Sequence, residues 1–352
     1  MPFALCAFHK EGRMRLPKFE YLEPRSLKEA VKAFAADPKG TLILAGGTDL
    51  IVNMKHGVIQ PKRLINLKAI PKLAYISEGK DGLRIGALTT LHELVSSSLI
   101  KKSYPILRQA AKEVAAYAHQ VMGTLGGNLC QGNRCRFYNQ SVFWRGVRPA
   151  CYKAGGEICH VVRKPKECHS TYCGDIAPVL IAMDAKIKLV GPVDERTLSL
   201  KRLYTQDGKK PLSLKKGEIL KEIFIPSPVG NTLYLKWRLR DSLEFPIVSL
   251  AVHLEKNGEN RIDMAKIIFS GVGEGPVEAS EAEKMLKDVS LDGPMIEKVS
   301  NQAVKEISPM RTSIASPAYK RKMAGILLRQ ALEKLWNVPA CPFLPAGRGG
   351  RE

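Results

Sequence analysis

Six of the eight cysteines in this chain fall between residues 130 and 173, in a segment with few periodic apolar residues. A long excursion of this kind has no core of its own and needs another stabiliser. Charged residues interrupt the N-terminus before a secretory signal core can form, so we expect reduced or metal-bound thiols rather than disulfides. The six are Cys130, Cys135, Cys151, Cys159, Cys168 and Cys173.

The spacing of these cysteines narrows the choice of metal site. The segment has no C-x-x-C pair, so a zinc ribbon lacks its usual spacing. Widely separated cysteines suit a loop that folds around an iron–sulfur cluster. Spacing alone does not choose four ligands among six. His160 and His169 directly follow two of the cysteines, but a solvated or hydrogen-bonded histidine is the commoner case.

Regular patterning flanks this segment on both sides. Apolar spacing predicts a mixture of strands and helices up to Pro228, followed by three strands and then helices, which suggests a separate α+β domain. The expected strands are 19–22, 42–45, short strands in 63–76 and 83–88, a strand after 185, 233–239, 247–255 and 262–273, and regular patterning continues as far as 223–228. The expected helices are 27–34, one or two within 89–116, one after Asp175, 279–288, 294–306 and 317–336.

The chain has 352 residues and a net charge of +21, which invites a nucleic-acid interpretation. Its basic residues are spread from Lys10 to Arg351, and aromatic residues make up only 7%. A single-strand binder needs basic residues interleaved with stacking aromatics, so we expect no nucleic-acid partner but an anionic substrate, redox partner or neighbouring subunit. No apolar run is long enough for a membrane helix, so we expect a cytoplasmic protein.

Two glycine-rich turns follow apolar segments. In the first, Gly46, Gly47 and Thr48 end a strand, where backbone N–H groups can approach phosphate oxygens. The second is GTLGGN at residues 123–128. Either turn alone is more often only a tight turn. Neither the Rossmann nor the P-loop fingerprint occurs, so any phosphate site has another architecture.

Taken together, five motifs resemble the flavoprotein subunits of the xanthine dehydrogenase and carbon monoxide dehydrogenase family. They are AGGTDL at 45–50, IGALTTLHEL at 85–94, GTLGGNLC at 123–130, GDIAPVLIAMDA at 174–185 and SPAYKRKMAGILLRQAL at 316–332. The resemblance implies an α+β fold: a PCMH-type (VAO-like) FAD-binding domain of two subdomains, then a C-terminal flavoprotein domain. The implied ranges are an extension at 1–13, the FAD-binding domain at 14–228 with an insertion at about 131–173, the second domain at 232–337 and a tail at 338–352.

The same resemblance implies the FAD-binding residues. The first glycine loop would wrap the pyrophosphate with Leu42, Ile43, Leu44, Ala45, Gly46, Gly47, Thr48 and Asp49. The opposing loop would supply Thr124, Leu125, Gly126, Gly127 and Asn128. Three single positions complete the set: Thr89, Asp175 as acceptor for a ribitol or ribose hydroxyl, and Lys236 near the isoalloxazine ring. A surface lysine on a strand is the alternative for Lys236.

The cysteine segment is similar to the insertion of 4-hydroxybenzoyl-CoA reductase β subunits. The match rests on NRCRFYNQSVFWR at 133–145, the cysteines that follow, and TY-x-GD at 171–175. It implies that Cys135, Cys151, Cys159 and Cys168 bind a [4Fe–4S] cluster, with Cys173 as an alternative to Cys168. Cys130 is expected to have a packing role, and Cys6 and Cys341 an incidental one.

These resemblances imply an electron-transfer subunit of an oxidoreductase, with FAD and a [4Fe–4S] cluster and no catalytic residue of its own. The implied partners are a large molybdopterin-binding subunit, a small [2Fe–2S] subunit and a ferredoxin-like donor, in a dimer of heterotrimers. The substrate of the complex would be 4-hydroxybenzoyl-CoA, which is reductively dehydroxylated. The alternatives are the FAD subunit of another molybdenum hydroxylase, a basic zinc-binding nucleic-acid protein, and an assembly subunit without flavin.

Overall fold

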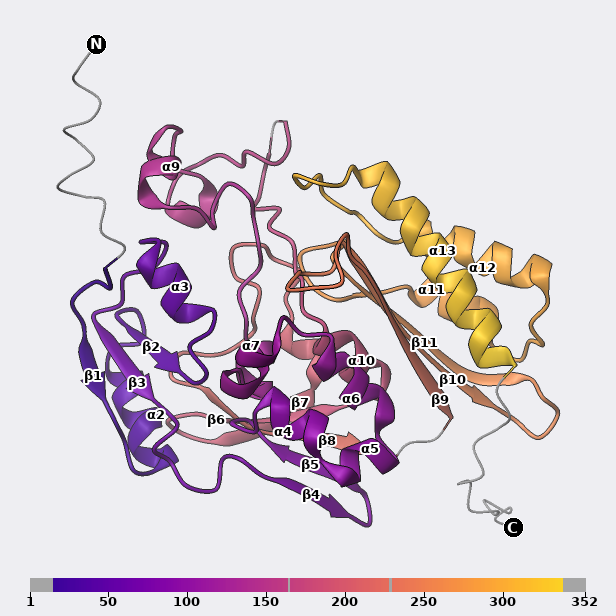
Figure 1. Ribbon diagram of the computed structural model, residues 1–352, viewed down its shortest axis with the longest axis horizontal. Coiled ribbons are helices and arrows are strands. Elements are labelled where there is room, and N and C mark those ends of the chain that lie inside the picture. Colours follow the sequence, from indigo (N-terminus) through magenta and orange to yellow (C-terminus); the bar gives the residue numbers. More distant parts are fainter. Residues whose placement is uncertain (1–14, 164, 228–229, 338–352) are drawn as a thin grey trace.

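The computed structural model describes residues 15–163, 165–227 and 230–337. Figure 1 shows three sheets that follow one another along the chain, with helices packed against each. The predicted extension and tail, with Cys6 and Cys341, lie outside the described residues. The expected α+β class is confirmed. No described helix combines the length and the apolar character needed to cross a membrane.

The first sheet is a small parallel sheet that carries the first glycine loop. Its strands are β1 (Glu20–Leu22), β2 (Thr41–Leu44) and β3 (Arg63–Asn66), in the order β1-β3-β2. Helix α2 (Leu27–Ala36) begins at Ser26, whose side chain accepts a hydrogen bond from the Glu29 backbone N–H and so caps the helix. The short helix α3 (Leu50–Lys55) follows the glycine loop after β2.

The second sheet is antiparallel and forms the larger half of the first domain. Its order is β4-β5-β8-β6-β7, from β4 (Ile76–Gly79), β5 (Gly82–Gly86), β6 (Lys186–Val190), β7 (Glu195–Ser199) and β8 (Ile219–Pro226). Its helices are α4 (Leu91–Ser96), α5 (Ser98–Ser103), α6 (Pro105–Lys112), α7 (Tyr117–Met122), α8 (Leu125–Leu129), α10 (Ile176–Ala182) and the 3₁₀ turn η2 (Leu200–Leu203). Residues 91–112 form three helices, since Ser97 caps α5 and Pro105 begins α6.

The third sheet lies between two apolar cores. Its order is β12-β11-β10-β9, from β9 (Asn231–Trp237), β10 (Val248–Lys256), β11 (Ile262–Ser270) and β12 (Val277–Glu278). Helices α11 (Ser280–Leu286), α12 (Gly293–Lys305) and α13 (Pro317–Trp336) cover one face (Figure 1). On the other face, Tyr234, Ala251 and Ile268 join the core that contains α10. The two domains therefore share buried surface through this sheet.

The cysteine segment connects α8 to α10 and packs against the end of α3. It contains the short helix α9 (Val142–Gly146) and the 3₁₀ turn η1 (Tyr152–Ala154). Figure 1 places α9 next to α3, and two hydrogen bonds join α9 to the residues that directly follow α3: Val142 N to His56 O at 3.1 Å and Arg145 Nη2 to Gly57 O at 2.8 Å. The sequence predicted little regular structure here, and a five-residue helix is below what apolar periodicity detects.

Phe269 of β11 is fully buried in the core under α11 to α13. Phe269→Ala removes most of a buried ring, so we expect the free energy of unfolding to fall by about 3–5 kcal/mol in urea denaturation. Phe143→Ala is the matched control, because the Phe143 side chain is 72% exposed and its loss should change stability by no more than about 0.5 kcal/mol. Equal losses in both variants would contradict this assignment of the core.

Candidate functional site

The two glycine loops lie directly against each other. A Cβ added to Gly46 would stand 2.3 Å from Met122 O and 2.8 Å from Gly123 Cα, so only glycine fits this approach. Gly47 has a φ of +74°, a conformation that side chains with a Cβ adopt rarely. The structure thus brings together two turns that are almost 80 residues apart in the sequence, as a phosphate cradle with two opposing loops requires.

The second glycine loop is held by hydrogen bonds to residues that directly follow strand β5. Leu125 N donates to Thr89 O and Gly126 N donates to Ala87 O, both at 2.8 Å. The Thr124 side chain caps α8 by accepting from Gly127 N at 3.1 Å. Asn128 Oδ1 is buried and has no hydrogen-bond partner in the described structure. A buried acceptor left open at this loop fits a ligand that carries a donor.

Thr89 has a different environment from the loops. Its side chain is buried, and its hydroxyl exchanges hydrogen bonds with the Tyr75 backbone, accepting from N at 3.0 Å and donating to O at 2.9 Å. With its hydroxyl used in this way, Thr89 acts on the loop through the carbonyl that binds Leu125 N.

Asp49 joins the first glycine loop to the cysteine segment. Its carboxylate accepts a hydrogen bond from Asn53 Nδ2 at 3.0 Å and forms an ion pair with Arg134. The Arg134 guanidinium also lies 4.8 Å from the centre of the Phe245 ring, in the second domain. Sequence reasoning missed Arg134, because nothing local in the sequence pairs it with a carboxylate 85 residues away.

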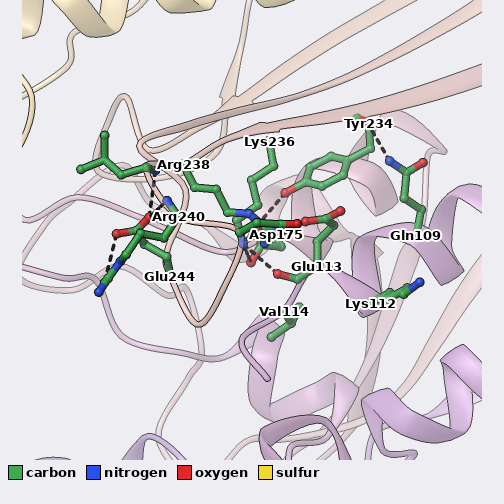
Figure 2. Close-up of polar contacts among 12 residues, drawn as sticks. Gln109, Lys112, Glu113, Val114, Asp175, Tyr234, Lys236, Arg238, Arg240 and Glu244 are labelled. Carbon is green, nitrogen blue, oxygen red and sulfur yellow. Dashed lines mark hydrogen bonds and ion pairs between the residues drawn. The ribbon is translucent and has the colours of Figure 1, made fainter. Parts of the chain in front are cut away.

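Asp175 and Lys236, two of the predicted positions, meet in a buried polar network (Figure 2). The Asp175 carboxylate accepts hydrogen bonds from the Tyr234 hydroxyl at 2.7 Å and from Lys236 Nζ at 3.1 Å. Lys236 Nζ also donates to Glu113 O at 2.8 Å. The Lys236 side chain is only 2% exposed. The alternative of a surface lysine is therefore wrong.

Burial controls the ionisation of this network. Desolvation raises the pKa of the Asp175 carboxyl above its usual value, while the Lys236 ammonium and the Tyr234 hydroxyl act in the opposite direction. Burial and the adjacent Asp175 carboxylate raise the pKa of Tyr234 well above its ordinary value. Tyr234 is therefore a donor at neutral pH, and Lys236 supplies the charge that a buried carboxylate needs.

Four of the six clustered cysteines line one small cavity. Cys135, Cys151, Cys159 and Cys168 all contribute to its wall. Its other lining residues include Phe137, Tyr138, Lys153 and Ser170. Burial raises the pKa of the Cys135 thiol and of the Cys168 thiol, and the neighbouring Cys159 raises both pKa values further. These thiols are thus close enough to influence one another electrostatically.

The remaining two cysteines of the segment are not among the cavity-lining residues. Cys173 Sγ contacts Thr171 O at 3.6 Å, and burial raises its pKa to about 11. Burial raises the pKa of Cys130 to about 12. His169 Nδ1 is paired with Glu274 at 2.8 Å, while His160, which also lines the cavity, has its Nε2 at 2.9 Å from Pro149 O.

Lys153 places a positive charge at the cysteine cavity. Its Nζ donates to Asn133 O at 3.1 Å and to Ser170 Oγ at 3.3 Å. Burial lowers the pKa of the Lys153 ammonium, and the neighbouring cysteines oppose that shift. Within the part of the chain that the structure describes, no three His, Cys, Asp or Glu side chains are grouped to hold a single metal ion.

Two family models match the chain. The FAD binding domain in molybdopterin dehydrogenase matches residues 17–228, and the CO dehydrogenase flavoprotein C-terminal domain matches residues 234–335. The chain belongs to the FAD-binding medium subunits of the xanthine and CO dehydrogenase family. This medium subunit is thus an FAD-binding subunit of an oxidoreductase, and the two-domain fold expected from the sequence is confirmed.

Known proteins match this medium subunit over nearly its whole length. The carbon monoxide dehydrogenase medium chain of Afipia carboxidovorans is 27% identical over 317 residues, 90% of this chain and 96% of that protein. The glyceraldehyde dehydrogenase medium chain of Sulfolobus acidocaldarius is 25% identical over 319 residues, 91% of this chain and 99% of that protein. A crystal structure of the Cu,Mo-CO dehydrogenase matches with a TM-score of 0.75 and 27% identity, covering 92% of this chain and 99% of the other.

Gly46→Ala tests the contact between the two glycine loops. The added methyl group meets backbone atoms that cannot rotate away, so the loops must separate and the dissociation constant for FAD should rise at least roughly tenfold in a fluorescence titration of the flavin-free chain. Gly132→Ala is the matched control, because no atom lies within 4 Å of its added Cβ. Unchanged FAD affinity in Gly46→Ala would refute the cradle.

Lys236→Met tests the buried ion pair. The substitution leaves the Asp175 carboxylate buried without the Lys236 ammonium. The pKa of Asp175 in the folded state should therefore rise further above its unfolded value of about 3.9. Stability then falls as pH rises above that unfolded value, and we expect a loss of about 3–5 kcal/mol at pH 8 and a smaller one at pH 5. Urea denaturation of Lys236→Met and of Lys236→Met with Asp175→Asn measures this. The double variant should regain stability at pH 8; no recovery would contradict the pairing.

Proposed function

We propose that this medium subunit carries electrons between a [4Fe–4S] cluster and FAD within a molybdenum enzyme of the 4-hydroxybenzoyl-CoA reductase type. The observation that carries the proposal is the cavity lined by Cys135, Cys151, Cys159 and Cys168, in a segment tied to the first glycine loop through Arg134 and Asp49. A family member that uses FAD alone has no need of four thiols around one cavity.

In the proposed FAD site, the two glycine loops bind the cofactor and the surrounding residues hold the loops in place. Residues 42–49 and 124–128 would hold the pyrophosphate with backbone N–H groups, and Asn128 Oδ1 offers the open acceptor. Bound FAD supplies one-electron and two-electron exchange. The Asp175 carboxylate and the Lys236 ammonium would set the polarity next to the flavin. Thr89 would hold the second glycine loop through its backbone carbonyl, which accepts a hydrogen bond from Leu125 N.

The cluster assignment agrees with the chemistry of the four thiols. A thiol whose pKa is raised by burial ionises at neutral pH only with a positive partner, and iron provides that partner. The Lys153 ammonium at the cavity wall would offset part of the negative charge of four thiolates. Because Cys168 lines the cavity and Cys173 does not, we assign Cys168 as the fourth ligand.

The proposed place of this chain is an electron relay in a cytoplasmic complex. A large molybdopterin-binding subunit and a small [2Fe–2S] subunit would accompany it, in a dimer of heterotrimers. A ferredoxin-like donor would reduce the [4Fe–4S] cluster, and the electrons would continue through FAD to the partner subunits. The phenolic hydroxyl of 4-hydroxybenzoyl-CoA would be removed at molybdenum, which leaves this chain without an acid–base catalyst of its own.

A second candidate is the FAD subunit of another molybdenum hydroxylase. It is supported by similarity to medium chains of carbon monoxide and glyceraldehyde dehydrogenases and to the xanthine dehydrogenase FAD-binding subunit of Escherichia coli O157:H7. The two candidates share the FAD site and differ in what the cysteine cavity holds.

Metal and flavin analysis of the anaerobically purified chain, with Cys151→Ser and Cys173→Ser, distinguishes the candidates. The reductase-type proposal expects FAD and about four irons per chain, with the characteristic absorbance of both. Cys151→Ser should lose the iron and retain FAD. Cys173→Ser is the matched control and should retain both, because Cys173 does not line the cavity. Zinc without iron, or full iron in Cys151→Ser, would overturn the cluster assignment.

A further inference from the structure

A groove separate from the glycine loops and from the cysteine cavity lies beside helix α2. It has a volume of about 740 Å³ and is lined by α2, by residues that follow β3, by the turn between β6 and β7 and by one residue of β8. We refer to it as the α2 groove. None of its described lining residues is among those predicted to bind FAD or a cluster. Its volume lies within the range of roughly 300–1,000 Å³ that small-molecule pockets occupy.

The wall of the α2 groove is apolar and its backbone is fixed. Val31 of α2 and Leu73 belong to the core that α2 shares with the first sheet, and Val190 of β6 packs against that core. Two hydrogen bonds tie the wall to the end of β5: Leu88 N donates to Leu73 O at 2.8 Å, and Ala87 N donates to the β8 backbone at 3.0 Å. The groove is thus preformed, and a ligand that enters it does not have to order the chain.

The charged residues of the α2 groove are almost all basic. Its lining includes five cations: Arg25, Lys28, Lys32, Lys72 and Lys221. Glu195 is the one acidic residue among the described lining residues, and its carboxylate forms an ion pair with Lys221 at 3.1 Å. The other four cations form no ion pair with any described carboxylate. The groove therefore joins an apolar wall to four cations without an ion-pair partner.

We propose that the α2 groove binds a nucleoside polyphosphate, in addition to the FAD of this chain. The base lies on the apolar wall, and the phosphates are bound by the Lys28, Lys32 and Lys72 ammonium groups. A polyphosphate carries the several negative charges that four free cations attract. An inorganic anion would leave the apolar wall in water, and an uncharged aromatic molecule would leave the cations unused. A nucleoside polyphosphate matches both parts of the groove.

The test uses the FAD-saturated chain and ATP as the probe, in equilibrium dialysis at about 0.15 M salt, which screens long-range attraction. Flavin absorbance shows that FAD stays bound, so the ATP is not in the FAD site. We expect about one ATP per chain. Tripolyphosphate, which cannot cover the apolar wall, and adenosine, which has no phosphates, should each bind at least roughly tenfold more weakly. Equal dissociation constants for ATP and tripolyphosphate would reveal general attraction to a chain of net charge +21 and overturn the proposal.

Two double variants locate the binding site. Lys28→Gln with Lys32→Gln removes two exposed charges from the groove and should raise the dissociation constant for ATP at least roughly tenfold. Lys101→Gln with Lys102→Gln is the matched control, because it removes two exposed lysines from α5, which does not line the groove. The control should bind ATP as the wild type does, and both variants should retain FAD. An equal loss of ATP affinity in the two variants would overturn the assignment to the α2 groove.

The same dialysis with the assembled complex shows whether the α2 groove is open where the chain functions. About one ATP per copy of this chain, with the affinity of the isolated chain, supports the proposal. If ATP binds the isolated chain but not the complex, a partner subunit covers the groove and the proposal is overturned. Failure of ATP to bind either form overturns it as well. None of these outcomes depends on what the cysteine cavity holds, so the proposed function is tested separately.

Discussion

The ion pair between Arg134 and Asp49 links the first glycine loop to the cysteine segment, and through it to the second domain. Asp49 ends the first glycine loop and holds α3 through Asn53, and Arg134 immediately precedes the first cavity cysteine. An acidic side chain next to a pyrophosphate would repel it, so a guanidinium on Asp49 removes an electrostatic obstacle as well as fixing the loop. With Phe245 on its other side, Arg134 also reaches the second domain. The cysteine segment is thus linked to the glycine loop that we propose holds the FAD pyrophosphate.

The sequence predicted well those features that depend on local pattern. Apolar patterning located β9, β10 and β11 of the third sheet and the helices over it, but not the two-residue strand β12. The glycine-rich motifs indicated two loops, and the structure places these loops in contact. The contact at Gly46 leaves no room for a side chain. Contacts between residues that are far apart in the sequence could not be predicted from it. Arg134 with Asp49, and Tyr234 with Asp175, join positions 85 and 59 residues apart, and no local rule pairs them.

The cysteine segment shows the same division. Residue type and the lack of a zinc spacing indicated a site for several thiols, but the spacing did not predict that Cys168, and not Cys173, would line the cavity with the other three. Cys173 lies two residues before Asp175, between Tyr172 and Gly174, whose backbone groups are hydrogen-bonded to the second domain. Cys168 is one of the residues that line the cavity. Neighbouring positions along the chain therefore face different environments.

Strand β9 explains why Lys236 is buried. Side chains alternate along a strand, so Tyr234 and Lys236 share one face, while Leu233, Leu235 and Trp237 share the other and pack under α13. The polar face of β9 meets Asp175 and Glu113 of the first domain, where an apolar pair would be easier to bury. An ion pair in this position fixes the register of the two domains, since sliding one past the other leaves two buried charges unpaired. Asp175 and Lys236, which the sequence predicted as FAD-binding residues, thereby also align the two domains.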